Sequence, residues 1–219
     1  APSCIVSAYS EVERPAFVKF LDYEIELGLV FKKAMNKPVK VTRENLHEYI
    51  AGLVIVNDYS ARDIQIPQMQ FYKGKSYRTF GPVGPYLCIL DKEDFPLIHQ
   101  LQLELTVNGQ VRQSDSTANL VFGPEVTLTE LSGMHDVEVG DLLATGTPAG
   151  CALSVPSPLK QKIGALLPEA TKWNMFMKVQ AQRTQYLKNG DVVRARIRSA
   201  CGKINLGEQQ NIVTLAPAV

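Results

Sequence analysis

Three carboxylates alternate with apolar residues in the segment LDYEIELGLV. Asp22, Glu24 and Glu26 share one face of the β-strand that this alternation predicts, and no lysine or arginine lies among them. A fourth acid, Asp58, ends the apolar run GLVIVND, where a carboxylate is costly unless it is paired or coordinated. The pattern calls for a positively charged partner.

A hard divalent cation is the partner that fits these acids. Mg²⁺, Mn²⁺ and Ca²⁺ take oxygen ligands, and one such ion neutralises several carboxylates. Residues i and i+2 of a strand lie roughly 6.5 to 7 Å apart on one face, so Glu24 and Glu26 can converge on one ion. Three carboxylates leave coordination positions open for water and substrate. The alternative is a solvated strand face, which the apolar surroundings of the segment disfavour.

The elements that must position these acids are mostly strands. Residues 21–30 and 52–58 predict two strands, the second buried on both faces. Asn108-Gly109 lies between two alternating segments and predicts a hairpin. The segment DLLATGTPAG predicts a strand that runs into a loop. The turn at Asn189-Gly190 precedes a strand whose inward side chains are expected to be Val193, Ala195 and Ile197.

Two segments predict helix. One begins at an N-cap, Thr42, and carries an apolar stripe of Leu46, Tyr49 and Ile50. The other lies in residues 151–187, which we interpret as an insertion with one or two short helices. Packing on a partner subunit, covering a site and plain surface elaboration are all compatible with its composition.

Composition excludes several classes of protein. The chain has 219 residues, 45% of them hydrophobic, and a formal net charge of +1, so it can bury a core and shows no bias toward nucleic acid or anionic membranes. No apolar run is long enough to span a bilayer. Cys4, Cys88, Cys151 and Cys201 form no CxxC, which favours free, mostly buried thiols and a cytoplasmic location.

Five segments together resemble the signature of the fumarylacetoacetate hydrolase family, in its C-terminal catalytic domain. They are LDYEIELGLV, GLVIVNDYSARDIQ, GKSYRTFGPVGPYL, TVNGQVRQSDST and GDLLATGTPAG. The resemblance implies a β-rich α+β fold, a mixed β-sandwich roll with a few short helices, and a homodimer. It implies a single catalytic domain over residues 1–219 that binds a small-molecule substrate and Mg²⁺, Mn²⁺ or Ca²⁺.

The resemblance also assigns roles to individual positions. It implies Glu24, Glu26 and Asp58 as metal ligands, and it leaves Asp22 outside the ligand set. The residues it implies as catalytic or substrate-binding are Arg62, Gln65, Lys75, Gly146 and Thr147.

Three of these residues also have a purely structural interpretation, with no role in catalysis or binding. Arg62 could pair with Asp63 or Asp58, Lys75 could be a solvated loop lysine, and Thr147 could be a turn residue. The combination of motifs favours the site.

A general base is harder to identify. Hydrolytic members of the family use a histidine, often paired with a glutamate, from a segment before the E-x-E motif. Residues 1–21 contain no histidine, and Glu11 and Glu13 are poor substitutes, so we expect the N-terminal lid segment to be absent. The three histidines, for which structural roles are expected, are His47, His99 and His135.

The leading expectation for function is metal-dependent hydrolysis of a C–C bond in an acylpyruvate-like or 1,3-dicarbonyl acid, through a metal-bound enolate. Decarboxylation or tautomerisation of a 2-oxo acid needs the same enolate without an activated water. A non-catalytic protein that binds a metal or a small acid is the third possibility. Product analysis separates the first two, and metal content after exchange of Glu24 and Glu26 for glutamine tests the site itself.

Overall fold

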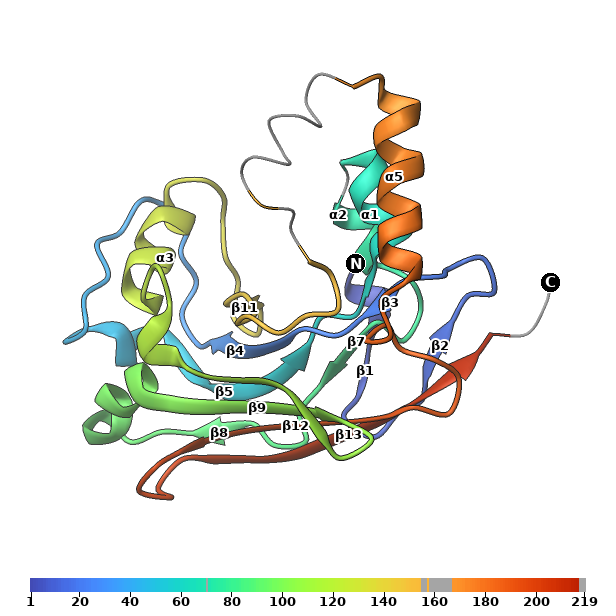
Figure 1. Ribbon diagram of the computed structural model, residues 1–219. Helices are drawn as coiled ribbons and strands as arrows, with labels where there is room; N and C mark the ends of the chain where they lie inside the picture. Colours follow the sequence, from blue (N-terminus) through green and yellow to red (C-terminus); the bar gives the residue numbers. More distant parts are fainter. Residues whose placement is uncertain (70, 155–156, 158–166, 217–219) are drawn as a thin grey trace.

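The computed structural model describes residues 1–69, 71–154, 157 and 167–216. Its strands form two stacked sheets, with helices gathered above one of them (Figure 1). In the described part of the chain, the sheet nearer the helices, here called the site sheet, consists in spatial order of β1 (Ile5–Ser7), β7 (Gly81–Val83), β5 (Ile50–Asn57), β4 (Ile25–Phe31) and β11 (Leu142–Ala144), with β8 (Cys88–Ile89) also paired to β5.

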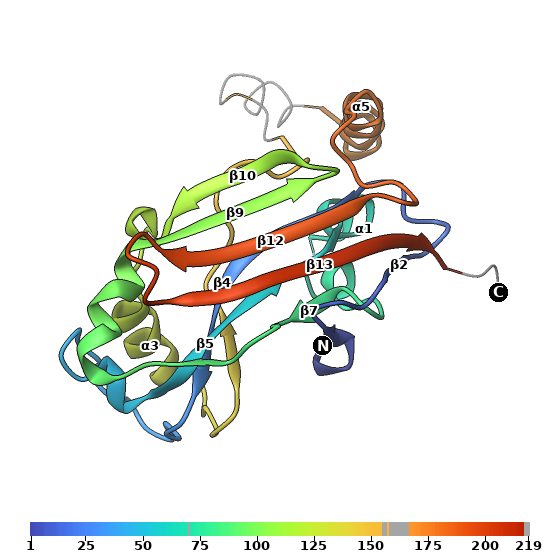
Figure 2. The ribbon, with the colours of Figure 1, turned by 90° about the horizontal axis from the view of Figure 1, so that it is seen from below.

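The second sheet, here called the back sheet, lies beneath the site sheet, and its long strands cross β4 and β5 at an angle (Figure 2). Its order is β10 (Gln110–Ser116), β9 (Leu101–Val107), β12 (Val192–Ser199), β13 (Asn205–Leu215) and β2 (Val12–Arg14). A small ladder joins β3 (Leu21–Asp22) to β6 (Ser60–Ala61).

The core lies between the two sheets. Ile25, Leu27 and Leu29 of β4 are fully buried, as the alternation of the sequence predicts. The inward-facing residues predicted on β12 are also confirmed, because Val193, Ala195 and Ile197 are each at most 1% exposed. Strand β4 is buried on its other face as well, so its Glu26 side chain is only 5% exposed.

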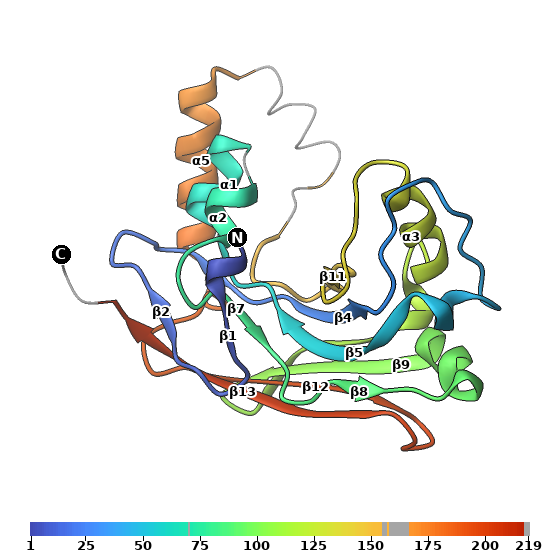
Figure 3. The same cartoon turned by 180° about the vertical axis from the view of Figure 1, so that it is seen from behind.

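The helices stand on the site sheet in two groups (Figure 3). One group consists of α1 (Arg62–Gln68), α2 (Phe71–Lys75) and α5 (Glu169–Ala181). The helix α3 (Pro124–Ser132) stands apart from this group. Short 3₁₀ turns are η1 (Pro2–Cys4), η2 (Leu46–Glu48), η3 (Lys92–Gln100) and η4 (Thr117–Asn119). No helix among the described residues has the length and apolar character needed to cross a membrane.

The predicted fold class is confirmed: mixed sheets dominate and the helices are few and short. The hairpin at Asn108-Gly109 is present, and both residues have the positive φ that such a turn requires. All four cysteines are free, as predicted, but only Cys4 is buried: Cys88 and Cys151 are partly exposed, and Cys201 is exposed. Of the predicted insertion, residues 155–156 and 158–166 lie outside the described residues, and the rest contains the single helix α5.

The helix predicted from Thr42 is wrong. Only the 3₁₀ turn η2 forms there, because Ile50 joins β5 and pairs with Phe31 of β4. The tertiary pairing of two buried strands outweighs the local helical stripe.

The predicted strand over residues 21–30 is broken into two. β3 ends at Asp22, β4 begins at Ile25, and the two pair with different strands. The bend at Tyr23-Glu24 separates Asp22 from the two glutamates.

Candidate metal centre and active site

Three carboxylates converge at one end of the β4–β5 pair. Glu24 and Glu26 flank the first residue of β4, and Asp58 follows the last residue of the antiparallel strand β5. The Asp58 backbone N–H donates to the Glu24 carbonyl at 2.9 Å, which fixes the two segments side by side. One carboxylate oxygen from each of Glu24, Glu26 and Asp58 lies within 4.8 Å of the others. The structure therefore brings together the three residues predicted as metal ligands.

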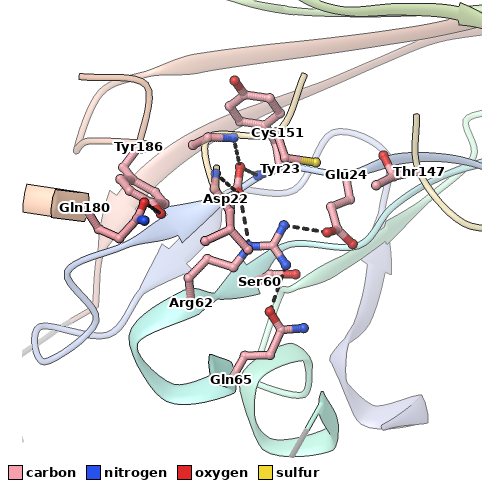
Figure 4. A network of polar contacts seen from close by, with 12 residues as sticks. Asp22, Tyr23, Glu24, Ser60, Arg62, Gln65, Thr147, Cys151, Gln180 and Tyr186 are labelled. Carbon is pink, nitrogen blue, oxygen red and sulfur yellow. Dashed lines mark hydrogen bonds and ion pairs between the residues drawn. The ribbon is translucent and has the colours of Figure 1, made fainter. Parts of the chain in front are cut away.

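Two cationic side chains line the carboxylate cluster. The Lys75 ammonium donates to Glu24 Oε2 at 2.7 Å and also to Asp58 Oδ2. The Arg62 guanidinium donates through Nη2 to the other oxygen of Glu24 (Figure 4). Arg62 therefore pairs with neither Asp63 nor Asp58, and Lys75 is no solvated loop residue.

Arg62 is held on its other side by Asp22. Its Nε donates to Asp22 Oδ2 at 2.9 Å and its Nη1 to Gln65 Oε1 at 2.8 Å (Figure 4). Asp22 is fully buried and also accepts the backbone N–H groups of Ala152 at 2.7 Å and Leu153 at 2.9 Å. Asp22 thus lies outside the carboxylate cluster, as expected, and anchors the arginine that lines it.

The helices α1 and α2 deliver the cationic residues. Arg62 is the first residue of α1 and Lys75 the last residue of α2. The two helices approach closely at Gly74, where an added Cβ would lie 2.7 Å from Gln65 Cβ and 3.1 Å from Gln65 Cα. Glycine at this position lets Lys75 reach the cluster while Gln65 reaches Arg62.

The loop after β11 carries the remaining predicted residues. The Gly146 backbone N–H donates to Glu26 Oε2 at 2.8 Å, so it supports a carboxylate of the cluster. The Thr147 hydroxyl donates to the Ile25 carbonyl at 2.9 Å and accepts from Gln113 Nε2 at 2.8 Å. A cavity of about 320 Å³ opens along this loop, and it is lined in part by Gly146, Thr147 and the exposed side chains of Val121 and Phe122.

Burial and mutual repulsion govern the protonation of the cluster. Burial, followed by the charge of Asp58, raises the pKa of Glu26 to about 7, although the Gly146 hydrogen bond acts to lower it. Burial also raises the pKa of Asp58, against the opposing effect of Lys75. For Lys75, burial acts to lower the pKa, but the Glu24 and Asp58 charges outweigh it and the pKa lies above its ordinary value.

The arrangement fits a hard divalent cation. Among the described residues, Asp22, Glu24, Glu26 and Asp58 face two cationic side chains, those of Arg62 and Lys75, so the acids outnumber the cations. Burial first, and then the neighbouring charges of Asp58 and Glu24, raise the pKa of Glu26, so the site disfavours a further negative charge there. The donors of the cluster are carboxylate oxygens alone, the ligand type that Mg²⁺, Mn²⁺ and Ca²⁺ prefer.

The three histidines make their contacts away from the cluster. The His47 ring packs against Phe95, and His99 Nε2 lies 3.7 Å from Glu125 Oε2 beside α3. His135 is exposed, and its Nδ1 lies 2.7 Å from the Asp136 carbonyl. Each therefore has the structural surroundings expected for it.

Reasoning from the sequence missed one residue that contacts the site, Gln113. It is completely buried on β10, and its amide group bonds to the loop after β11 and to the strand that carries the carboxylates. A signal was present: a long polar side chain in the segment TVNGQVRQSDST, which takes part in the family resemblance without any assigned role.

The chain matches a protein-family model and several curated proteins. The family model described as fumarylacetoacetate hydrolase, C-terminal, matches residues 1–214. An oxaloacetate tautomerase of Bacillus subtilis is 37% identical over 155 residues, which cover 70% of this chain and 48% of that protein. A bifunctional isomerase/decarboxylase of 4-hydroxyphenylacetate degradation from Salmonella dublin is 35% identical over 157 residues, which cover 71% of this chain and 35% of that protein. The chain thus spans about half the length, or less, of these curated relatives.

Solved structures show the same fold. A fumarylacetoacetate hydrolase from Exiguobacterium antarcticum superposes with a TM-score of 0.75 and 33% sequence identity, covering 99% of this chain and 65% of that one.

Proposed function

Because the chain belongs to the fumarylacetoacetate hydrolase family, we propose that it is a divalent-metal-dependent enzyme that tautomerises a small 2-oxo acid between its enol and keto forms. The observation that carries this proposal is the convergence of Glu24, Glu26 and Asp58 beside the Lys75 ammonium. The similarity to an oxaloacetate tautomerase supports the choice of reaction.

Each part of the site has a role in this chemistry. A divalent cation held by Glu24, Glu26 and Asp58 would polarise the oxo group and stabilise negative charge on its oxygen. Arg62 and Gln65, which are hydrogen-bonded to each other, supply donors for the substrate carboxylate. Their mutual bond and the Asp22 contact hold these donors in place before the substrate arrives.

Lys75 is the residue that we propose to carry the proton. Tautomerisation of an enol breaks its O–H bond, forms a C–H bond at the neighbouring carbon and moves the double bond from C=C to C=O, with no group lost. Arg62 cannot exchange protons in a protein, whereas a lysine ammonium can. Lys75 Nζ reaches Glu24 and Asp58 from the end of α2, so it lies directly beside two of the proposed metal ligands.

The second candidate reaction is C–C bond hydrolysis of an acylpyruvate-like acid. The similarity to a solved fumarylacetoacetate hydrolase supports it. Hydrolysis needs a base that activates water. Since His47, His99 and His135 all make their contacts elsewhere, the described residues supply no histidine for that role. Tautomerisation needs no such water, and the similarity to an oxaloacetate tautomerase supports it, so we place it first.

Assays with two substrates test the proposal. With Mg²⁺ or Mn²⁺, the chain should accelerate conversion of enol-oxaloacetate to the keto form above the spontaneous rate, as followed by loss of enol absorbance. Chelation by EDTA and exchange of both Glu24 and Glu26 for glutamine should each abolish the acceleration. Cleavage of an acylpyruvate to pyruvate and a carboxylic acid would instead support hydrolysis. Metal binding without turnover of either acid would indicate a binding protein and contradict the proposal.

We also propose that the chain forms a homodimer, as the family resemblance implies. The strongly exposed apolar pair Val121 (88% exposed) and Phe122 (65% exposed) is compatible with such an interface. Light scattering coupled to size exclusion tests this, and a monomeric mass at micromolar concentration would contradict it.

A further inference from the structure

Gln113 occupies an unusual place for a glutamine. It lies on β10, at the edge of the back sheet, and is completely buried, whereas Val111 on the same strand is 57% exposed. Residues two apart on a regular strand share a face. The register shifts between Val111 and Gln113, so Arg112 is the extra residue of a β-bulge. The bulge turns the Gln113 side chain inward, toward the site sheet.

Both the oxygen and the nitrogen of the Gln113 amide form hydrogen bonds in this position. Its Oε1 accepts the Ile25 backbone N–H at 3.1 Å, and its Nε2 donates to Thr147 Oγ1 at 2.8 Å and to the Pro148 carbonyl at 2.9 Å. A buried amide with both donors and its acceptor satisfied has one orientation available to it. The side chain thereby joins the back sheet, the start of β4 and the loop after β11.

These hydrogen bonds extend the pairing along the edge of β4 beyond the point where β11 ends. β11 pairs with β4 only as far as Gly28, and Thr145 then donates to the Leu27 carbonyl through its N–H and its hydroxyl. Two residues further, no strand in the described part of the chain pairs with the free edge of Ile25. The Thr147 hydroxyl donates to the Ile25 carbonyl, and Gln113 Oε1 accepts the Ile25 N–H. Side chains therefore satisfy both backbone groups of Ile25 on this edge.

Ile25 is the residue between the two glutamates of the cluster. Fixing both of its edge-facing backbone groups fixes the strand segment from which Glu24 and Glu26 project. We propose that Gln113, acting with Thr147, is a positioning residue that sets the geometry of the Glu24–Glu26 ligand pair. The inference rests on the proposed metal site and adds residues that do not themselves touch the ion.

Metal affinity in the absence of substrate provides the readout. Gln113→Met keeps the length of the side chain and removes all of its hydrogen bonds, and we expect it to weaken Mn²⁺ binding roughly 10- to 100-fold, the usual effect of losing a group that orients a metal ligand. Isothermal titration calorimetry with Mn²⁺ measures the affinity, and far-UV circular dichroism confirms that the variant is folded.

Gln209 offers a matched control. It is also a completely buried glutamine, but its Nε2 donates to the Pro82 carbonyl at 3.1 Å and to the Gly84 carbonyl, away from the carboxylates. Gln209→Met should lower stability as Gln113→Met does, yet leave Mn²⁺ affinity within about threefold of the wild type. Equal losses of affinity in the two variants would reduce the effect to general destabilisation and overturn the inference.

A second pair of variants keeps the test decisive if Gln113→Met fails to fold. Thr147→Val removes the hydroxyl at constant shape and should weaken Mn²⁺ binding, whereas Thr147→Ser keeps the hydroxyl and should restore it. Wild-type affinity in a folded Gln113→Met or Thr147→Val variant overturns the inference. Absence of Mn²⁺ binding by the wild-type chain is a different result, because it removes the metal site and the proposed function with it.

Discussion

At the scale of single residues, Asp22 shows how neighbouring carboxylates on one chain segment acquire different roles. Glu24 and Glu26 project into a cluster with Asp58, while Asp22 accepts hydrogen bonds from Arg62 and from three backbone N–H groups. A fully buried carboxylate is tolerable only with such partners. Its function is to hold the arginine that faces the cluster.

Asp22→Asn should therefore cost stability and leave metal binding intact. The variant removes the charge that pairs with Arg62 in a buried setting, and we expect a loss of about 3 kcal/mol in the free energy of unfolding. Urea denaturation measures the loss, and calorimetry with Mn²⁺ should give an affinity near that of the wild type. Asp63→Asn, which lies next to Arg62 on α1 and is partly exposed, is the control and should cost less. Loss of Mn²⁺ binding on Asp22→Asn would show that Asp22 is a ligand after all.

Lys75 tests whether the site moves a proton. Lys75→Arg keeps a positive charge beside Glu24 and Asp58 but cannot release a proton. We expect kcat for oxaloacetate tautomerisation to fall by roughly 10²- to 10⁴-fold, with Mn²⁺ affinity changed only a few-fold. Lys73→Arg, on the exposed face of α2, should leave kcat unchanged. Retention of wild-type kcat in Lys75→Arg would assign the proton transfer to another group.

At the scale of elements, the strands could be predicted and their junctions could not. Alternation and Asn-Gly turns identify β9, β10 and β12, because each of these patterns depends on nearby residues alone. The bend at Tyr23-Glu24 depends on β3 and β4 pairing with different partners, which is a tertiary property.

The same division applies to the site. The ligand trio follows from residue types and the family motif. The bulge that turns Gln113 inward is a shift in the register of β10 against β9, and the residue types of β10 alone do not reveal it.

The contact between α1 and α2 carries a prediction of its own. Gly74→Ala would place a methyl group 2.7 Å from Gln65 Cβ and 3.1 Å from its Cα, and backbone cannot yield as a flexible side chain does. We expect α2 to shift outward, at a cost of about 1 to 3 kcal/mol in the free energy of unfolding and at least a tenfold loss of kcat. Thermal unfolding and tautomerase assays measure both.

Lys73→Ala changes the neighbouring, exposed position of α2 and should affect neither quantity. Unchanged kcat in Gly74→Ala would mean that the position of Lys75 does not depend on this contact.

At the scale of the whole molecule, the cluster joins segments that are distant in sequence, and its charge opposes folding. Among the described residues, the three carboxylates of the cluster face two cationic side chains, Arg62 and Lys75, where β4, the end of β5, α1 and α2 meet. A cation that binds only the folded chain should therefore stabilise it. At a concentration of 100 times its Kd, the gain is about 2.7 kcal/mol.

For a chain of this size, a gain of that magnitude corresponds to a rise in Tm of about 5 to 10 °C. Differential scanning calorimetry with Mg²⁺ or Mn²⁺ against EDTA measures the rise. Glu26→Gln should remove most of it, because the variant loses a ligand, and should itself raise the Tm of the metal-free protein by relieving repulsion. Glu48→Gln, which alters an exposed ion pair with Lys33, should keep the full metal-dependent rise. An equal rise in Glu26→Gln and the wild type would place the stabilising ion elsewhere on the molecule.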